Sequence, residues 1–129
     1  MTAKVHTNTE LIQEVANRAG RWGMRKGLQG GAVAGSRKHT YADRLLTRYQ
    51  RMYGDRGLTT EVSYCRGQAG LHGKGSIRLD VVEGPLNNPA AIYDYKFGTA
   101  QLIPSRIDRI RRIGEFVDSV PIIPVRPQQ

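Results

Sequence analysis

The segment from residue 76 to residue 97 constrains the fold of this chain more than any other. It contains the strings Ser76-Ile-Arg-Leu-Asp80 and Ile92-Tyr-Asp94-Tyr-Lys96. The first string alternates and continues into Val81 and Val82, and the second holds one isoleucine and two tyrosines, as strands do. Residues 84–89 between them hold two prolines and two asparagines, as a turn does. We therefore expect two neighbouring antiparallel strands, at residues 76–83 and 91–97.

The other elements follow from side-chain periodicity. Apolar residues recur at helical spacing over residues 9–26, 41–53 and 105–118. Residues 58–65 alternate as a strand does. Residues 120–125 form a short strand, which two prolines confine to the edge of a sheet, and the tail after it is expected to fray. The chain is therefore expected to have an α/β (α+β) fold, with the order αβββαβ after an extra N-terminal helix.

Two helix starts and one joint complete the expected organisation. Thr7 with Glu10, and Ser105 with Asp108, match capping boxes that begin the first and third helices. The glycine-rich stretch 27–35 is aperiodic and is interpreted as a flexible joint. The chain of 129 residues suits one compact domain. Within this domain, we expect residues 1–38 to form the first helix and a linker, and residues 39–129 to form the core.

The charge of the chain favours an anionic partner. Lys and Arg number 20 against 11 Asp and Glu, a formal net charge of +9. Nucleic acid, an acidic membrane surface and an acidic protein all fit this balance.

The single cysteine, Cys65, excludes a disulfide within the chain, and no apolar run approaches the length of a membrane span. We expect no membrane association and no disulfide partner.

Asp80, Asp94 and Lys96 are the residues most suited to chemistry. Side chains alternate along a strand, so Asp94 and Lys96 share one face, and the turn brings Asp80 opposite or diagonal to Asp94. Carboxylates are ligands that Mg²⁺ and Mn²⁺ prefer, and a lysine beside them can position a nucleophile. The alternative is a cross-strand charge pair on a solvated face, worth a few tenths of a kcal/mol.

Other acidic residues are candidates for a fourth carboxylate. Glu61 on the first strand, and Glu10 or Glu14 on the first helix, are possible additional metal ligands. Thr40 and Asp43 match a capping box at the start of the second helix, where the charge of Asp43 complements the helix dipole.

These residues resemble the PD-(D/E)XK nuclease superfamily, which has the restriction-endonuclease-like fold. The resemblance covers about residues 39–125, with Asp80 as the first motif carboxylate and Asp94-x-Lys96 as the second motif. Leu79 stands where many members have Pro. The resemblance implies a mixed central sheet flanked by helices and an endonuclease that uses Mg²⁺ or Mn²⁺. It also implies that Asp80, Asp94 and Lys96 are catalytic. Many members add an acidic ligand on the helix before the sheet, and Asp43 stands at that place here, with Glu61 as its rival.

Basic and polar residues near these positions are candidates for contacts to nucleic acid. Arg106 falls within the apolar stripe of the third helix and needs a partner there, such as a carboxylate or a substrate phosphate. Arg109 belongs to a solvated basic face that suits a phosphate backbone. The full set of candidates is Lys38, His39, Lys74, Arg78, Gln101, Arg106 and Arg109.

The small, basic chain with a glycine-rich entry also resembles the C-terminal nuclease toxin domains of bacterial polymorphic toxins and Rhs-type effectors. This resemblance implies DNA as substrate, with RNA not excluded, and an acidic immunity protein as partner. It also implies delivery as part of a larger effector into the cytoplasm of a target cell. The alternatives are a Holliday-junction or repair nuclease, a non-catalytic basic module that binds nucleic acid, and a structural interaction domain.

Overall fold

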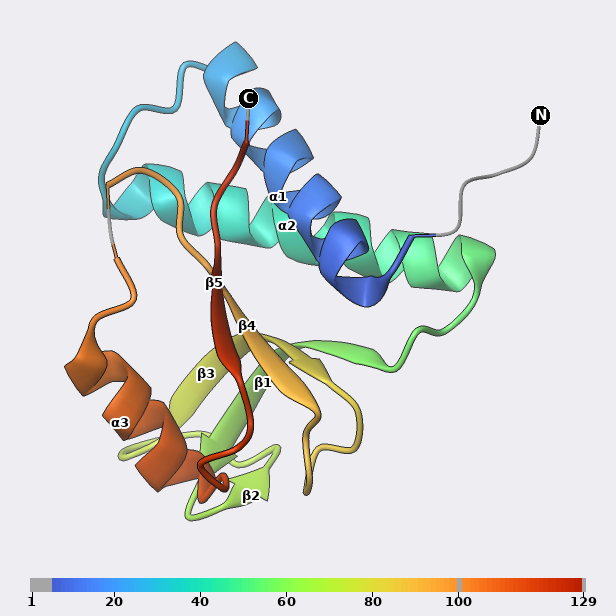
Figure 1. The fold of residues 1–129 in the computed structure, drawn as a ribbon. Coiled ribbons are helices and arrows are strands. Elements are labelled where there is room, and N and C mark those ends of the chain that lie inside the picture. The colour runs from blue at the N-terminus through green and yellow to red at the C-terminus, as the bar shows by residue number, and fades with distance from the viewer. Residues whose placement is uncertain (1–5, 100, 129) are drawn as a thin grey trace.

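A computed structural model of the chain describes residues 6–99 and 101–128 (Figure 1). After α1 the order matches the predicted αβββαβ arrangement, apart from one extra two-residue strand. The fold class is the expected mixture of helices and a mixed sheet. The elements are α1 (Asn8–Arg25), α2 (Ala32–Tyr53), β1 (Leu58–Cys65), β2 (Gln68–Ala69), β3 (Ile77–Glu83), β4 (Ala91–Tyr95), α3 (Pro104–Gly114) and β5 (Ile122–Val125).

The five strands form one sheet in the order β2-β1-β3-β4-β5. Neighbouring strands are antiparallel except β4 and β5, which run parallel. The predicted pair of adjacent strands is confirmed as β3 and β4, with Val81 opposite Tyr93. The last strand lies at the sheet edge, as its prolines Pro121 and Pro124 require.

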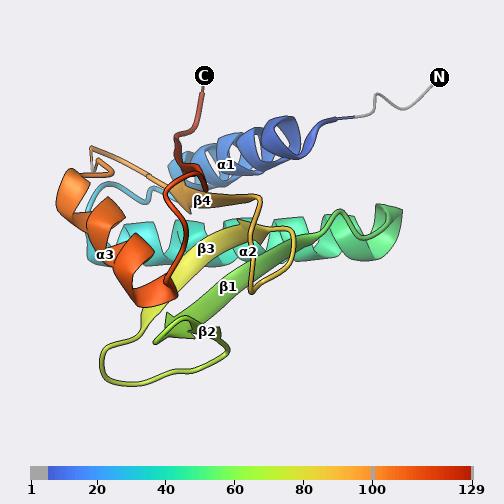
Figure 2. The same ribbon diagram turned by 60° about the horizontal axis from the view of Figure 1, so that its bottom comes forward.

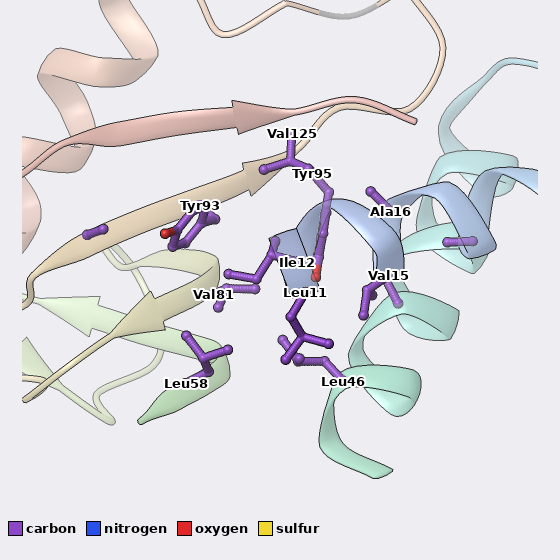
Figure 3. Close-up of a cluster of buried hydrophobic side chains, with 13 residues drawn as sticks. Leu11, Ile12, Val15, Ala16, Leu46, Leu58, Val81, Tyr93, Tyr95 and Val125 are labelled. Carbon is purple, nitrogen blue, oxygen red and sulfur yellow. The ribbon is translucent and has the colours of Figure 1, made fainter. Parts of the chain in front are cut away.

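Helices cover both faces of the sheet. One hydrophobic cluster joins α1 and α2 to strand residues such as Tyr93, and Figure 3 shows its side chains converging between the strands and the two helices. A second cluster joins Ile110 of α3 to strand residues such as Ile92. Ile92 and Tyr93 are consecutive and point to opposite faces, so the two clusters lie on opposite sides of the sheet. The turned view in Figure 2 shows α3 lying away from the α1–α2 pair.

The first helix packs into the same core as the rest of the chain. Its capping box is confirmed: Thr7 Oγ1 accepts from the Glu10 N–H at 3.1 Å, and Glu10 Oε1 accepts from the Thr7 N–H at 3.1 Å. Ile12 of α1 is fully buried. The tail, expected to fray, is instead held on α1, where Gln128 N–H donates to Asn17 Oδ1 at 2.7 Å.

The second helix begins much earlier than predicted, so the flexible-joint interpretation is wrong for residues 32–35. Gly31 has φ 110°, in the left-handed region that favours glycine, and turns the chain directly into α2. The early turns of α2 are then held against α1. Lys38 covers Gly23, and the rings of Trp22 and Tyr41 stack with centroids 4.6 Å apart. The expected division between residues 38 and 39 therefore falls inside a helix.

The third helix differs from its prediction at both ends. It begins at Pro104 after Ile103, without a side-chain cap, so the Ser105 capping box is wrong; proline suits this first position because the N–H it lacks has no partner there. It ends at Gly114 because Glu115 adopts a left-handed φ of 54°. Arg111 Nη1 then donates to carbonyl oxygens of the following turn, at Val117 and Val120.

Truncating Ile12 tests whether α1 belongs to the cooperative core. Ile12 is 0% exposed, so Ile12→Ala should lower the free energy of unfolding by about 2–5 kcal/mol and shift a single melting transition. Met24 is 73% exposed on the same helix, and Met24→Ala should change it by less than about 0.5 kcal/mol. Thermal or urea unfolding measures both. An Ile12→Ala protein that melts like the wild type would show that α1 is a separate appendage.

Candidate active site

Three acidic residues lie in one row across the three central strands. The β1–β3 pairings on either side of Glu61 place it opposite Asp80. Continued by one residue, the β3–β4 register places Asp94 opposite Asp80 as well. Opposite residues on neighbouring strands have Cβ atoms about 5 Å apart. The pairing of the sheet therefore places three acidic residues in one row, at neighbouring positions on β1, β3 and β4.

The regular alternation of the strands breaks at this row. Glu61 has φ 52°, which is rare for a residue with a side chain. On β1, Leu58 packs in the cluster under α1 and α2, whereas Val62, an even number of residues later, packs in the cluster under α3. On β3, Val81 and Leu79 divide in the same way. At Glu61 in β1 and at Asp80 in β3, the side chains of the strand therefore change the face of the sheet to which they alternate.

Asp94 and Lys96 form a buried ion pair. Lys96 Nζ lies 2.9 Å from Asp94 Oδ2, and Asp94 is only 5% exposed. The Lys96 N–H donates to the carbonyl of Val125 at 2.9 Å, which holds the residue just beyond the end of β4. Burial raises the pKa of Asp94 above its ordinary value, and the charge of Asp80 adds to that rise, while Lys96 opposes it.

Asp80 is held in place by two hydrogen bonds. Its Oδ2 accepts from the Tyr95 N–H at 2.7 Å, and its Oδ1 lies 3.2 Å from His39 Nδ1. Burial alone would lower the pKa of His39, but the hydrogen bond to Asp80 and the nearby carboxylate charges raise it above its ordinary value. Each carboxylate oxygen of Asp80 retains a second lone pair for another partner.

A cleft of about 670 Å³ opens over this row. Four of the 11 Asp and Glu residues of the chain line it, although the chain is basic overall. α2 forms one wall, and the start of α3 contributes Arg106. The lining residues are Ser36, His39, Thr40, Asp43, Glu61, Ser63, His72, Arg78, Asp80, Asp94, Lys96 and Arg106.

Asp43 lies in the cleft and is not a helix cap. Because α2 begins at Ala32, Thr40 and Asp43 are inside the helix, and Thr40 Oγ1 donates to the Ser36 carbonyl at 3.1 Å. The capping-box explanation of Asp43 is therefore wrong. Asp43 Oδ1 is buried without a hydrogen-bond partner in the structure. A buried carboxylate oxygen in that state favours a cation or another donor beside it.

The carboxylates of the cleft fit a divalent metal. Besides Asp43, Glu61 Oε2 and Asp94 Oδ2 are buried without hydrogen bonds of good geometry; their partners are the charges of Arg78 and Lys96 at ion-pair distance. Within residues 6–99 and 101–128, no three His, Cys, Asp or Glu side chains are grouped closely enough to hold a metal as they stand. Mg²⁺ commonly takes one or two carboxylates and completes its shell with water and phosphate oxygens.

Other predicted residues divide between the cleft and its surroundings. Arg78 lies 2.8 Å from Glu61 through Nε, and Arg106 donates to the Arg78 carbonyl at 3.5 Å. Both line the cleft, as His39 does. The cleft lining does not include Lys38, Lys74, Gln101 or Arg109.

The rival carboxylates on α1 have structural roles. Glu10 completes the capping box of α1, and Glu14 pairs with Arg18 at 3.1 Å and with Arg21 at 3.4 Å. Neither lines the cleft.

Four lining residues were not predicted from the sequence as part of a site: Ser36, Thr40, Ser63 and His72. Ser36 and Thr40 precede the predicted Asp43 at intervals of four and three along α2, so a helix beginning at residue 32 would have placed them on its face. Ser63 is a buried polar residue of β1, and His72 lies in the loop before β3. No sequence signal distinguishes these two from ordinary strand and loop residues.

Comparisons with known proteins add no relative to this picture. No protein-family model matches the chain, and no significant match was found among curated proteins or solved structures. In the described part of the chain, no helix is both long and apolar enough to cross a membrane.

Neutralising Glu61 tests the electrostatic strain in the cleft. Burial raises the pKa of Glu61, repulsion from Asp80 and Asp43 adds to the rise, and Arg78 opposes it. The folded protein therefore binds more protons than the unfolded chain between the unfolded and folded pKa values, and its stability falls as pH rises through that window. In EDTA at pH 7, Glu61→Gln should melt roughly 1–3 °C higher than the wild type.

The same measurement has a pH control. The advantage of Glu61→Gln should shrink as pH falls through the folded pKa of Glu61, because the wild type then loses the charge that the variant lacks. Asp118 is exposed and outside the cleft, so Asp118→Asn should leave the melting temperature unchanged at both pH values. A Glu61→Gln protein that melts lower than the wild type at pH 7 would contradict this electrostatic account.

Proposed function

We propose that this protein is a metal-dependent endonuclease of PD-(D/E)XK type that hydrolyses the phosphodiester bonds of DNA. The buried Asp94–Lys96 pair beside Asp80 is the observation that carries the proposal. The pair lies in a cleft where four carboxylates meet three Lys and Arg side chains. Carboxylates suit a divalent metal, and the cations suit the phosphates of a nucleic acid.

The burial of the pair argues against an ordinary surface charge pair. A solvated cross-strand pair contributes a few tenths of a kcal/mol and needs no burial. Here Asp94 is buried, and Asp80 opposite it adds repulsion that raises the pKa of Asp94. Burying like charges together lowers stability unless a ligand compensates them. A divalent cation held by Asp80 and Asp94 would supply that compensation.

The carboxylates of the cleft, Lys96 and His39 each have a role in the proposed hydrolysis. Asp80 and Asp94 would hold Mg²⁺ or Mn²⁺, which would supply Lewis-acid stabilisation of the phosphate and would lower the pKa of water. Lys96, fixed by Asp94, orients the attacking water and stabilises the negative charge that develops on the phosphate. His39 and the Tyr95 N–H hold Asp80 in position. Asp43 and Glu61 line the same cleft, and either would have to move closer to join Asp80 and Asp94 as a ligand.

Two arginines are suited to hold the substrate phosphate. Arg78 and Arg106 come from β3 and α3 and reach the same cleft, joined by the hydrogen bond of Arg106 to the Arg78 carbonyl. The guanidinium group binds phosphate oxygens in a two-pronged arrangement that lysine does not offer. Arg78 is paired with Glu61 at 2.8 Å and can exchange that partner for a phosphate.

The narrower proposal concerns the biological setting. A strongly basic nuclease domain that is small enough to be one part of a larger protein fits the toxin domain of a bacterial effector. An acidic immunity protein would then cover the cleft and neutralise its basic surroundings. The net charge of +9 supports this complementarity.

Plasmid cleavage tests the proposed activity. The wild type should cut plasmid DNA with Mg²⁺ and lose activity in EDTA. Asp94→Asn and Lys96→Ala should each lower the cleavage rate by about 10²-fold or more, because each removes a group that acts on the reacting phosphate. The rate is measured from the loss of supercoiled DNA on a gel.

Matched variants separate the cleft from general charge effects. Asp118→Asn and Lys26→Ala change exposed groups outside the cleft and should retain wild-type rates. Full activity in Asp94→Asn, or equal activity in EDTA, would refute the metal-dependent mechanism. Salt-sensitive DNA binding with no cleavage in any metal would instead identify a non-catalytic basic module.

A further inference from the structure

Three exposed arginines form a stripe along α2 beside the cleft. Arg44, Arg48 and Arg51 lie within about 60° of one another around the helix axis, since successive residues turn by about 100°. They line a shallow hollow together with Thr47 and Asp43, and Asp43 also lines the cleft. The stripe is therefore continuous with the candidate active site.

No acidic side chain in the described part of the chain forms an ion pair with the stripe. Among the residues that the structure describes, none of Arg44, Arg48 and Arg51 takes part in an ion pair. On α1 the arrangement is different, because Arg18 and Arg21 both pair with Glu14. The arginines of the α2 stripe thus differ from Arg18 and Arg21 of α1, which share an acidic partner.

The spacing of the stripe lowers the stability of α2. Arg44 and Arg48 are four residues apart, and Arg48 and Arg51 are three apart, so their like charges are neighbours on the helix surface. Like charges at these spacings destabilise a helix. The three side chains are exposed. An anionic ligand along the stripe would reverse the sign of this interaction.

We infer that Arg44, Arg48 and Arg51 bind the phosphate backbone of a double-stranded nucleic acid beside the cleft. The inference rests on the proposed function for the position of the cut phosphate, which lies in the cleft next to Asp43. The stripe spans about 10 Å along the helix, or about three nucleotide steps of one strand. The stripe binds backbone phosphates away from the reacting phosphate, and this binding is independent of base sequence.

The composition of the cleft favours duplex over single strand. Proteins that hold single strands without sequence preference stack the bases on aromatic side chains. No Phe, Tyr or Trp is among the residues that line the cleft or the arginine hollow. Charge without a stacking platform suits a duplex, whose bases are already stacked and whose backbone faces outward.

Binding measured in EDTA tests the stripe without any cleavage. The probes are a labelled DNA duplex of about 20 base pairs and its isolated strand, titrated at several salt concentrations. The variant R44Q/R48Q/R51Q should bind the duplex roughly tenfold or more weakly, and the slope of log K against log salt should fall by about 3. Its melting temperature should equal or exceed that of the wild type.

The control and the opposing outcomes are specific. R18Q/R21Q removes two arginines from α1 that are already paired and should leave the affinity and the salt slope close to those of the wild type. Unchanged duplex binding by the triple variant would overturn the inference, and so would an equal loss on the single strand. Loss of duplex binding in the triple variant, with no cleavage by the wild type in Mg²⁺, would retain the binding stripe and reject the nuclease.

Discussion

The pairing of β1, β3 and β4 is the constraint on which the candidate site depends. The register of β1 and β3 places Glu61 opposite Asp80, and the register of β3 and β4, continued by one residue, places Asp94 opposite Asp80. A shift of either strand by one residue would turn these side chains to the other face and separate the carboxylates. The hydrophobic clusters on both faces of the sheet fix this register, because each is filled by particular residues of the same strands. The core therefore positions the site.

The residues of the cleft lower the stability of the folded protein. Glu61 adopts a left-handed backbone, Asp94 is buried as a charge, and buried carboxylate oxygens of Asp43 and Glu61 lack hydrogen bonds. Such features destabilise a fold and cluster where function requires them. In this protein they gather in a single cleft. The arginine stripe on α2 adds like-charge repulsion next to it, so the same helix carries stability-lowering features on two adjoining surfaces.

Much of the sheet could be predicted from the sequence, because alternating side chains indicate strands, and proline and asparagine indicate turns. That reasoning placed β1 at its observed bounds and put Asp94 and Lys96 on one face. It failed for α2, whose glycine-rich start hides a helix that is stabilised by packing against α1. With the start of α2 misplaced, Asp43 looked like a cap. The position of Glu61 depends on a left-handed backbone inside a strand, which no residue pattern reveals.

The central claim is that Asp80 and Asp94 hold a divalent cation beside Lys96. Anomalous X-ray scattering from crystals of the protein grown with Mn²⁺ tests it most directly. The account predicts a single strong peak about 2 Å from carboxylate oxygens of both Asp80 and Asp94, absent from crystals of Asp94→Asn. A cleft without a peak at Mn²⁺ concentrations that support DNA cleavage, or a peak bound only by other residues, would contradict it.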